Sequence, residues 1–133
     1  MTLSLPSEPR QDALAVRPGA ARVLDAQALS RLADLDPDGR AGLVARVLST
    51  YAQSLERLLG QLRQARDEGD MQTQRHVAHT LKSSSASVGA LCLSALCAEA
   101  EERLRDGLVE GLDEQLDRLA ADGHRVLAAL QQA

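Results

Sequence analysis

The chain has 133 residues, which is enough for one domain with a single hydrophobic core. Tyr51 is the only aromatic residue, and Leu and Ala dominate the apolar content, so the composition favours helices packed on helices over a sheet. A net charge of -4 argues against nucleic acid as the main partner. The sequence has neither the ~20 consecutive apolar residues that cross a bilayer nor the basic-then-apolar order of a signal peptide, so we expect a cytoplasmic protein that does not insert into membranes.

The first 20 residues contain Pro6, Pro18 and Gly19 among mixed charges and keep no sustained hydrophobic period. We therefore expect residues 1–20 to be a flexible tail and residues 21–133 to form the folded domain.

In residues 21–133, apolar side chains recur at three- and four-residue spacing, which predicts a short helix followed by four long ones. Asp25 is suited to cap the short helix, and Gly69-Asp70 is suited to end the first long helix and cap the next. The expected helices run from about Ala26 to Ala33, from about Asp38 to Asp67, from Asp70 to about Val88, through the stripe Leu93 to Leu104 as far as Asp106, and from about Val109 to Leu130.

Four amphipathic helices joined by short turns must be antiparallel to their neighbours in sequence. The expected fold is all-α, an up-down-up-down four-helix bundle with the short first helix as a lid on one end.

The helix that contains His79 has two unlike faces. With about 100° per residue, one face lies within about 60° of His79 and is basic and small, while the opposite face is apolar. This pattern predicts that the His79 face is open to contact by another macromolecule. The residues near His79 are Gln72, Arg75, His76, Lys82, Ser83 and Ala86, and the apolar ones are Val77, Leu81 and Val88.

The segment Ala78-His79-Thr80-Leu81-Lys82-Ser83-Ser84-Ser85, followed by Val88-Gly89-Ala90, resembles the motif of histidine-containing phosphotransfer (HPt) domains. The family pattern reads roughly Ala-His-x-Leu-Lys-Gly-Ser-(Ser/Ala)-x-x-(hydrophobic)-Gly-Ala. Ser83 departs from it, because the family usually has Gly there. More loosely, the resemblance extends from about Leu24 to Leu130 through the order and lengths of the helices.

The resemblance implies that His79 accepts a phosphoryl group. A neutral imidazole is a nucleophile at neutral pH, and its phosphoramidate is labile enough to be passed on. Lys82 and Arg75, one turn away on either side, are expected to offer positive charge to the phosphoryl oxygens. Ser83 is small enough to let a partner approach, and its hydroxyl is a further candidate donor.

The remaining motif residues are expected to serve docking or structure. Gln72, His76 and Ala86 lie on the His79 face and are candidates for the docking surface. Leu81 is apolar. Ser84 is expected to point partly inward and Ser85 to lie on the flank, where small residues let neighbouring helices approach, and the two hydroxyls can bond back to the carbonyl one turn earlier. Gly89 is expected to end the helix with a positive φ.

The sequence has no glycine-rich phosphate loop, no nucleotide-binding signature and no carboxylate cluster for Mg²⁺, so we expect a phosphocarrier and not an enzyme, with no cofactor of its own. The resemblance implies that Mg²⁺ and the aspartate are supplied by the receiver domain of a response regulator, and that a sensor or hybrid histidine kinase is the other partner. We expect a monomer.

Two alternatives remain open at this point. The chain could be a helical adaptor that binds a histidine kinase or response regulator without carrying phosphate. A weaker alternative is a metal site formed by His76 and His79, which has only two ligands and no third His or Cys nearby.

Several other polar residues have plain structural interpretations. His124 is expected at the surface of the last helix, and the acidic run Glu99, Glu101 and Glu102 as a solvated helix face. Cys92 and Cys97 are expected to be buried free thiols, since their spacing fits neither a redox pair nor a zinc knuckle.

Overall fold

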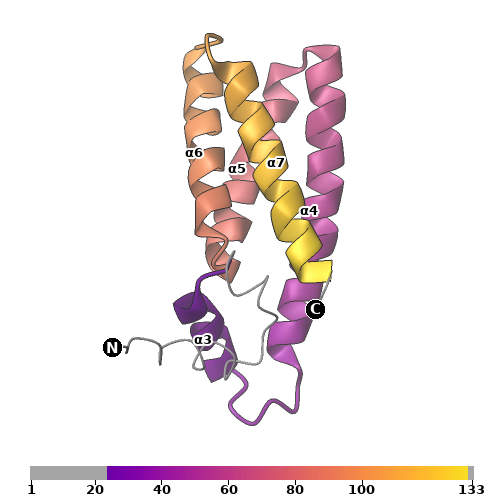
Figure 1. Cartoon of the computed structure of the whole chain (residues 1–133), viewed down its shortest axis with the longest axis vertical. Coiled ribbons are helices and arrows are strands. Elements are labelled where there is room, and N and C mark those ends of the chain that lie inside the picture. The colour runs from indigo at the N-terminus through magenta and orange to yellow at the C-terminus, as the bar shows by residue number, and fades with distance from the viewer. Residues whose placement is uncertain (1–23, 132–133) are drawn as a thin grey trace, which may run out of the picture.

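The computed structural model describes residues 24–131, so the predicted N-terminal tail lies outside the described residues. This part of the chain contains five helices and no strand (Figure 1). The helices are α3 (Ala26–Asp34), α4 (Leu43–Glu68), α5 (Met71–Val88), α6 (Leu91–Asp106) and α7 (Leu112–Gln131).

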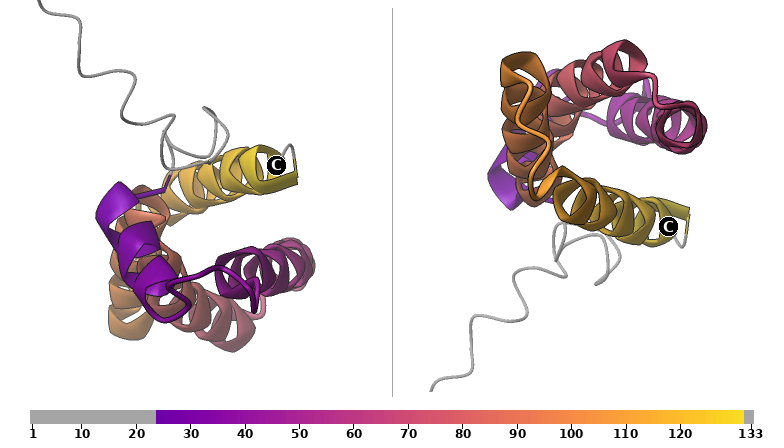
Figure 2. Two further views of the ribbon diagram at one scale, coloured as in Figure 1. Left: turned by 90° about the horizontal axis from the view of Figure 1, so that it is seen from below. Right: turned by 90° about the horizontal axis from the view of Figure 1, so that it is seen from above.

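The four long helices form an up-down-up-down bundle, as predicted. Each packs against its neighbour in sequence, and α7 returns to contact α4, so the four helices enclose one core (Figure 2). The short helix α3 lies across the end at which α5 stops and α6 begins, where it contacts α4 and α5. The predicted fold class is therefore confirmed.

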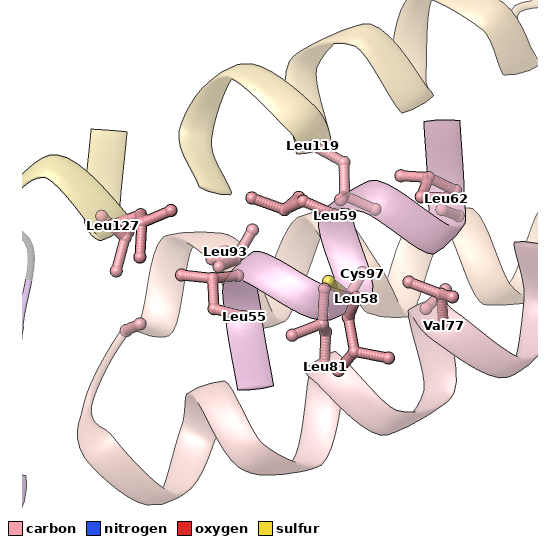
Figure 3. Close-up of a cluster of buried hydrophobic side chains, with 14 of the residues drawn as sticks. Leu55, Leu58, Leu59, Leu62, Val77, Leu81, Leu93, Cys97, Leu119 and Leu127 are labelled. Carbon is pink, nitrogen blue, oxygen red and sulfur yellow. The ribbon is translucent and has the colours of Figure 1, made fainter. Parts of the chain in front are cut away.

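The core is almost entirely aliphatic, as the composition requires. Leu residues of α4 meet Val77 and Leu81 of α5, Leu93 and Cys97 of α6, and the apolar stripe of α7 (Figure 3). The most deeply buried large side chains come from all four long helices, which confirms the amphipathic stripes read from the sequence. They are Leu55, Leu58, Leu81, Leu93, Leu116, Leu119, Val77 and Val126.

Gly89 joins α5 to α6 and also fastens α3 to the bundle. Its φ of 87° is left-handed, which confirms the predicted helix stop. A Cβ atom at this position would lie 2.8 Å from the backbone nitrogen of Asp25 and 2.9 Å from the Cβ of Ala28. The backbone N–H of Asp25 donates to the Gly89 carbonyl at 2.7 Å. A side chain is therefore excluded for two reasons, only one of which the sequence predicted.

Two helices begin later than predicted. Helix α4 begins at Leu43 and not near Asp38, because the Asp36 carboxylate accepts the backbone N–H groups of Ala41 and Leu43 and holds residues 36–42 as a turn. Helix α7 begins at Leu112 and not at Val109, because the guanidinium of Arg103 donates to the Glu110 carbonyl at 2.6 Å and pins the preceding loop.

Candidate functional site

The local sequence fixes both ends of α5, the helix that carries His79. At its start, the Asp70 carboxylate accepts the backbone N–H of Thr73 at 3.0 Å and the Thr73 hydroxyl at 2.6 Å. These two hydrogen bonds lower the pKa of the Asp70 carboxyl. The N-cap and the glycine stop were both predicted, and together they set where α5 begins and ends.

Helix α5 has one buried and one exposed face, and the residues predicted at the centre of each lie there. Val77, Leu81 and Val88 are buried, whereas the imidazole of His79 is 63% exposed. The side chains grouped with His79 in the sequence share its surface, and Lys82 among them is half-buried. The exposed ones are Gln72, Arg75, His76, Ser83 and Ala86.

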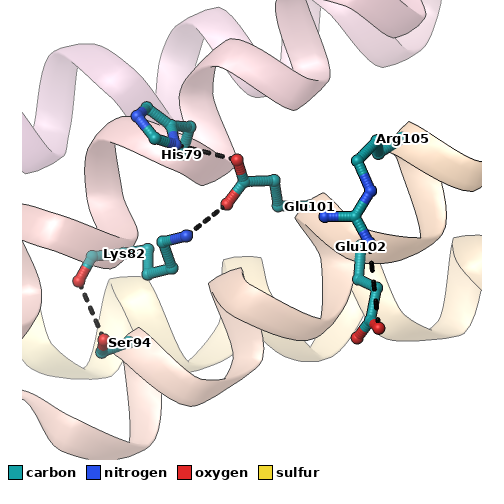
Figure 4. Close-up of polar contacts among 6 residues, drawn as sticks. All are labelled: His79, Lys82, Ser94, Glu101, Glu102 and Arg105. Atoms are coloured by element: carbon teal, nitrogen blue, oxygen red, sulfur yellow. Dashed lines mark hydrogen bonds and ion pairs between the residues drawn. The ribbon is translucent and has the colours of Figure 1, made fainter.

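One carboxylate on α6 links His79 to Lys82 (Figure 4). Nδ1 of His79 lies 2.8 Å from Oε2 of Glu101, and Nζ of Lys82 lies 2.7 Å from Oε1 of the same residue. The Glu101 side chain is only 14% exposed. We call these three residues the His79 cluster. It brings two predicted site residues together through a third that was assigned no role.

The carboxylate decides which nitrogen of His79 is free. Hydrogen bonding to Lys82, and to a lesser degree to His79, lowers the pKa of the Glu101 carboxyl, so Glu101 is ionised at neutral pH. An ionised carboxylate only accepts hydrogen bonds, so Nδ1 of His79 must carry the hydrogen. In the neutral ring, the lone pair is then on Nε2, which no described residue bonds.

A second contact between α5 and α6 holds the cluster in register. The hydroxyl of Ser94, two turns before Glu101 on α6, donates to the backbone carbonyl of Lys82 at 2.8 Å. Because residues seven apart share one helix face, Ser94 and Glu101 both face α5. The backbone of the cluster is therefore held at Lys82 as well as at its side chains.

The prediction for Ser85 was wrong. Ser85 is fully buried, and its hydroxyl pairs with the Tyr51 hydroxyl of α4 at 2.7 Å, not with a carbonyl of its own helix. Gln74, Ala78 and Ser85 are all buried in addition to the predicted apolar residues. The centre of the buried face of α5 is therefore rotated from its predicted position toward these three residues. Packing on α4 and α6 sets that centre. Ser84 is half-buried, as its partly inward position predicted, but the predicted bond to a carbonyl of its own helix is absent, because its buried Oγ has no hydrogen-bond partner among the described residues.

Two further predictions were wrong in part. The acidic run is not uniformly solvated, because Glu101 belongs to the His79 cluster; Glu99 and Glu102 are exposed. Cys97 is buried, whereas Cys92 is exposed, and both thiols are free. His124 is exposed, as predicted.

A signal for Glu101 was present in the sequence. Two antiparallel helices joined by a tight turn place residues equidistant from that turn side by side, and His79 and Glu101 each lie eleven residues from Ala90. The apolar pattern of a single helix does not reveal this pairing, which appears only when the two helices are compared.

Residues 24–131 contain no group of three or more His, Cys, Asp or Glu side chains placed to hold a metal ion. His76 and His79 lie one turn apart, but the described residues bring no third ligand to them. None of the described helices is long and apolar enough to cross a membrane.

Comparison with known proteins decides the family. The family model described as the Hpt domain matches residues 46–133, two thirds of the chain. The chain belongs to the Hpt domain family. The match begins inside α4 and includes the whole His79 cluster, while α3 lies before it. Members of this family are histidine phosphotransfer domains of phosphorelays, and a role in a phosphorelay follows from membership.

A solved structure supports the same assignment. The chain is similar to the crystal structure of histidine-containing phosphotransfer protein B (HptB) from Pseudomonas aeruginosa PAO1, with 28% sequence identity and a TM-score of 0.72. The match covers 84% of this chain and 94% of that one, so it extends beyond the family model toward the N-terminus. A search of curated proteins finds no match.

Proposed function

We propose that this Hpt domain accepts a phosphoryl group on Nε2 of His79 and passes it to or from the aspartate of a response-regulator receiver domain. The observation that carries the proposal is the His79 cluster. Glu101 occupies Nδ1, so the nitrogen with a free lone pair is Nε2 of an imidazole that is 63% exposed. This is the arrangement that a nucleophile for a large phosphorylated partner requires.

In the transfer step, the Nε2 lone pair forms a bond to phosphorus as the bond from phosphorus to the aspartyl oxygen breaks. The electron pair of the broken bond returns to the aspartate as its carboxylate. Because Nδ1 keeps its hydrogen, the ring can later leave as a neutral imidazole when the phosphoryl group moves to the next receiver. The same residue therefore serves as acceptor and as donor.

The surroundings of Nε2 suit a phosphoryl group. Arg75 is exposed one turn before His79, and neither it nor His76 forms an ion pair within residues 24–131. We propose that Arg75, Lys82 and the Ser83 hydroxyl contact the phosphoryl oxygens. Gln72, His76 and Ala86 extend the same surface and are proposed to touch the receiver.

The chain is proposed to act as a phosphocarrier without a cofactor of its own. In this proposal the receiver brings Mg²⁺ together with its aspartate, and a sensor or hybrid histidine kinase is the source or destination of the phosphoryl group further along the relay. The family assignment supports partners of these two kinds.

The test is to incubate the chain with a phosphorylated receiver domain and Mg²⁺, and to follow the label by intact mass and acid lability. We expect one acid-labile, alkali-stable phosphoryl group that is absent in His79→Gln. His124→Gln is the matched control, since His124 is an exposed histidine of the same chain on α7, outside the proposed docking surface, and the variant should still be labelled. Binding without label, across several donors, would instead support an adaptor.

A further inference from the structure

The five large apolar side chains that residues 24–131 leave exposed are not spread evenly over the molecule. Met71, Leu108 and Val109 lie at one end of the bundle, where α5 begins and where a loop joins α6 to α7 (Figure 1). They are 43%, 53% and 63% exposed. The other two, Leu35 and Leu91, lie at the end that α3 covers. Single exposed apolar residues are normal on a protein surface, whereas three that share one end mark a candidate contact site.

The register of α5 and α6 brings these three residues to one level of the bundle. The two helices are antiparallel, and Met71 and Val109 are equally far from Ala90 along the chain. The first turn of α5 and the loop after α6 therefore lie at the same end. We call Met71, Leu108 and Val109 the loop-end apolar group.

Hydrogen bonds to backbone groups fix the loop that carries Leu108 and Val109. The N–H of Leu108 donates to the Arg103 carbonyl at 2.9 Å, and the N–H of Leu112 donates to the Val109 carbonyl at 3.1 Å. The guanidinium of Arg103 donates to the Glu110 carbonyl at 2.6 Å. A surface that is ordered before binding loses little conformational entropy when a partner binds. The loop therefore presents its two apolar side chains in a fixed position.

The charged side chains next to the loop-end apolar group are mainly acidic. Glu68 ends α4 just before the turn into α5, and Asp106 ends α6 just before the loop. Glu110 lies in the loop, and Asp113 and Glu114 lie in the first turn of α7. All five carboxylates belong to exposed residues.

The arginines at this end are bound to groups of the chain itself or share a pocket with acids. Arg66 pairs with two aspartates of α7, at 3.0 and 3.6 Å, and Arg105 pairs with the acid that follows it, at 3.2 Å. Arg103 bonds the loop carbonyl. Arg63 is exposed, but with Arg66 and three aspartates it lines a pocket between α4 and α7. The balance of charge at this end is therefore negative, opposite in sign to the His79 face.

We propose that the loop-end apolar group and the acidic residues around it form a second docking surface, for a protein segment that carries both apolar and basic side chains. Apolar contacts at the centre of such an interface exclude water, and a rim of opposite charge selects the partner. Met71 is turned by about 80° from His79 around α5 and lies two turns before it. The surface is therefore separate from the basic face on which the proposed phosphotransfer takes place, and it goes beyond that function.

The test is the binding of a fluorescent helical peptide of Leu and Lys, apolar on one face and basic on the other, to the full chain by fluorescence anisotropy. We expect Met71→Ser/Leu108→Ser/Val109→Ser to weaken binding by about tenfold, because a few central contacts dominate an interface. Glu110→Gln/Glu114→Gln should weaken it by roughly threefold at low salt and by less at high salt. A peptide with Glu in place of Lys should not bind measurably.

A matched variant at the opposite end controls for unspecific attraction between the peptide and an acidic chain. Leu35→Ser/Leu91→Ser removes exposed apolar side chains without changing the net charge and should bind the peptide as wild type does. All these residues are exposed, so the variants should fold, which circular dichroism and urea denaturation check. Wild-type affinity in the triple variant, or equal losses at the two ends, overturns the proposal.

Two further measurements test the kind of partner. Light scattering over a range of concentrations should show a monomer; a dimer that the triple variant abolishes would make this end an interface between copies of the chain and overturn the proposal. Labelling of His79 by a phosphorylated receiver should be unchanged by saturating peptide and by the triple variant. A loss of labelling in either case would assign the loop-end apolar group to the docking surface of the receiver and overturn a second surface. Peptide binding is measured on the unphosphorylated chain, so its result stands apart from whether His79 accepts a phosphoryl group.

Discussion

Helix α5 carries a polar cluster on each of its two faces, and the two are built from different groups. On the exposed face, the ionisable side chains of His79 and Lys82 pair with Glu101 of α6. On the buried face, Ser85 and Tyr51 pair through neutral hydroxyls at 2.7 Å. Burial is the main cause that raises the pKa of Tyr51 to about 12, so this pair stays uncharged across the physiological range. Burying a charge costs free energy, so the ionisable side chains lie on the face that reaches water and the neutral hydroxyls lie in the core.

The difference assigns separate tasks to the two faces. A buried hydrogen bond contributes to stability and fixes how α4 meets α5, since an unpaired hydroxyl there is costly. Ion pairs with a partner that reaches solvent, as His79 and Lys82 do, contribute little to stability. Substitutions in the His79 cluster should therefore change the chemistry of the site more than the stability of the fold. Substitutions in the Tyr51–Ser85 pair should change the free energy of unfolding.

The largest expected effect is on the buried face. Leu81→Ala removes a fully buried side chain from the centre of the core, and the free energy of unfolding should fall by about 3 kcal/mol in urea denaturation. Ser83→Ala is the matched exposed control and should change it by less than about 0.5 kcal/mol. An equal loss of unfolding free energy in the two variants would mean that α5 does not have one buried and one exposed face.

A smaller effect is expected for the hydroxyl pair. Ser85→Ala leaves the Tyr51 hydroxyl buried without its partner, which should cost about 1 to 2 kcal/mol of unfolding free energy. Tyr51→Phe should act similarly. The double variant should cost less than the sum of the two, because no orphaned hydroxyl remains. Additive costs in this double-mutant cycle would show that the hydroxyls do not interact.

The smallest effect concerns the titration of the exposed cluster. Hydrogen bonds from Lys82 and His79 lower the pKa of the Glu101 carboxyl, so its stabilising contacts are complete above the usual value of about 4.3 and are lost as the pH falls through the lowered one. The carboxyl carbon of Glu101, followed by NMR, should titrate below about pH 4.3. In Lys82→Gln its midpoint should move back up; a midpoint independent of residue 82 would contradict the contact.

Local sequence signals predicted most of the fold. Asp70 and Gly89 bound α5 as expected, because caps and left-handed stops depend on neighbouring residues only. The apolar stripes identified the core for the same reason. The late starts of α4 and α7 were missed because they depend on Asp36 and Arg103, which act through hydrogen bonds to backbone groups five to seven residues away.

The site was predicted less completely than the fold. The motif placed His79 and Lys82 on one exposed face, and both are there. Glu101 was missed, and Ser85 was placed on a flank, because both depend on how a second helix packs against α5. The apolar period of one helix predicts only approximately which side chains face the core. The packing of the neighbouring helices then fixes the direction of the buried face.

The tight connection between α5 and α6 has a consequence for insertions and deletions. His79 and Glu101 lie equally far from Ala90, and Ser94 holds the intervening register at the Lys82 carbonyl. One residue inserted at the start of α6 would turn every later side chain by about 100° and move it about 1.5 Å along the helix. Glu101 would then leave Nδ1 of His79 although no residue of the cluster had changed. The chemistry of this surface therefore depends on the number of residues between the two helices as well as on their identities.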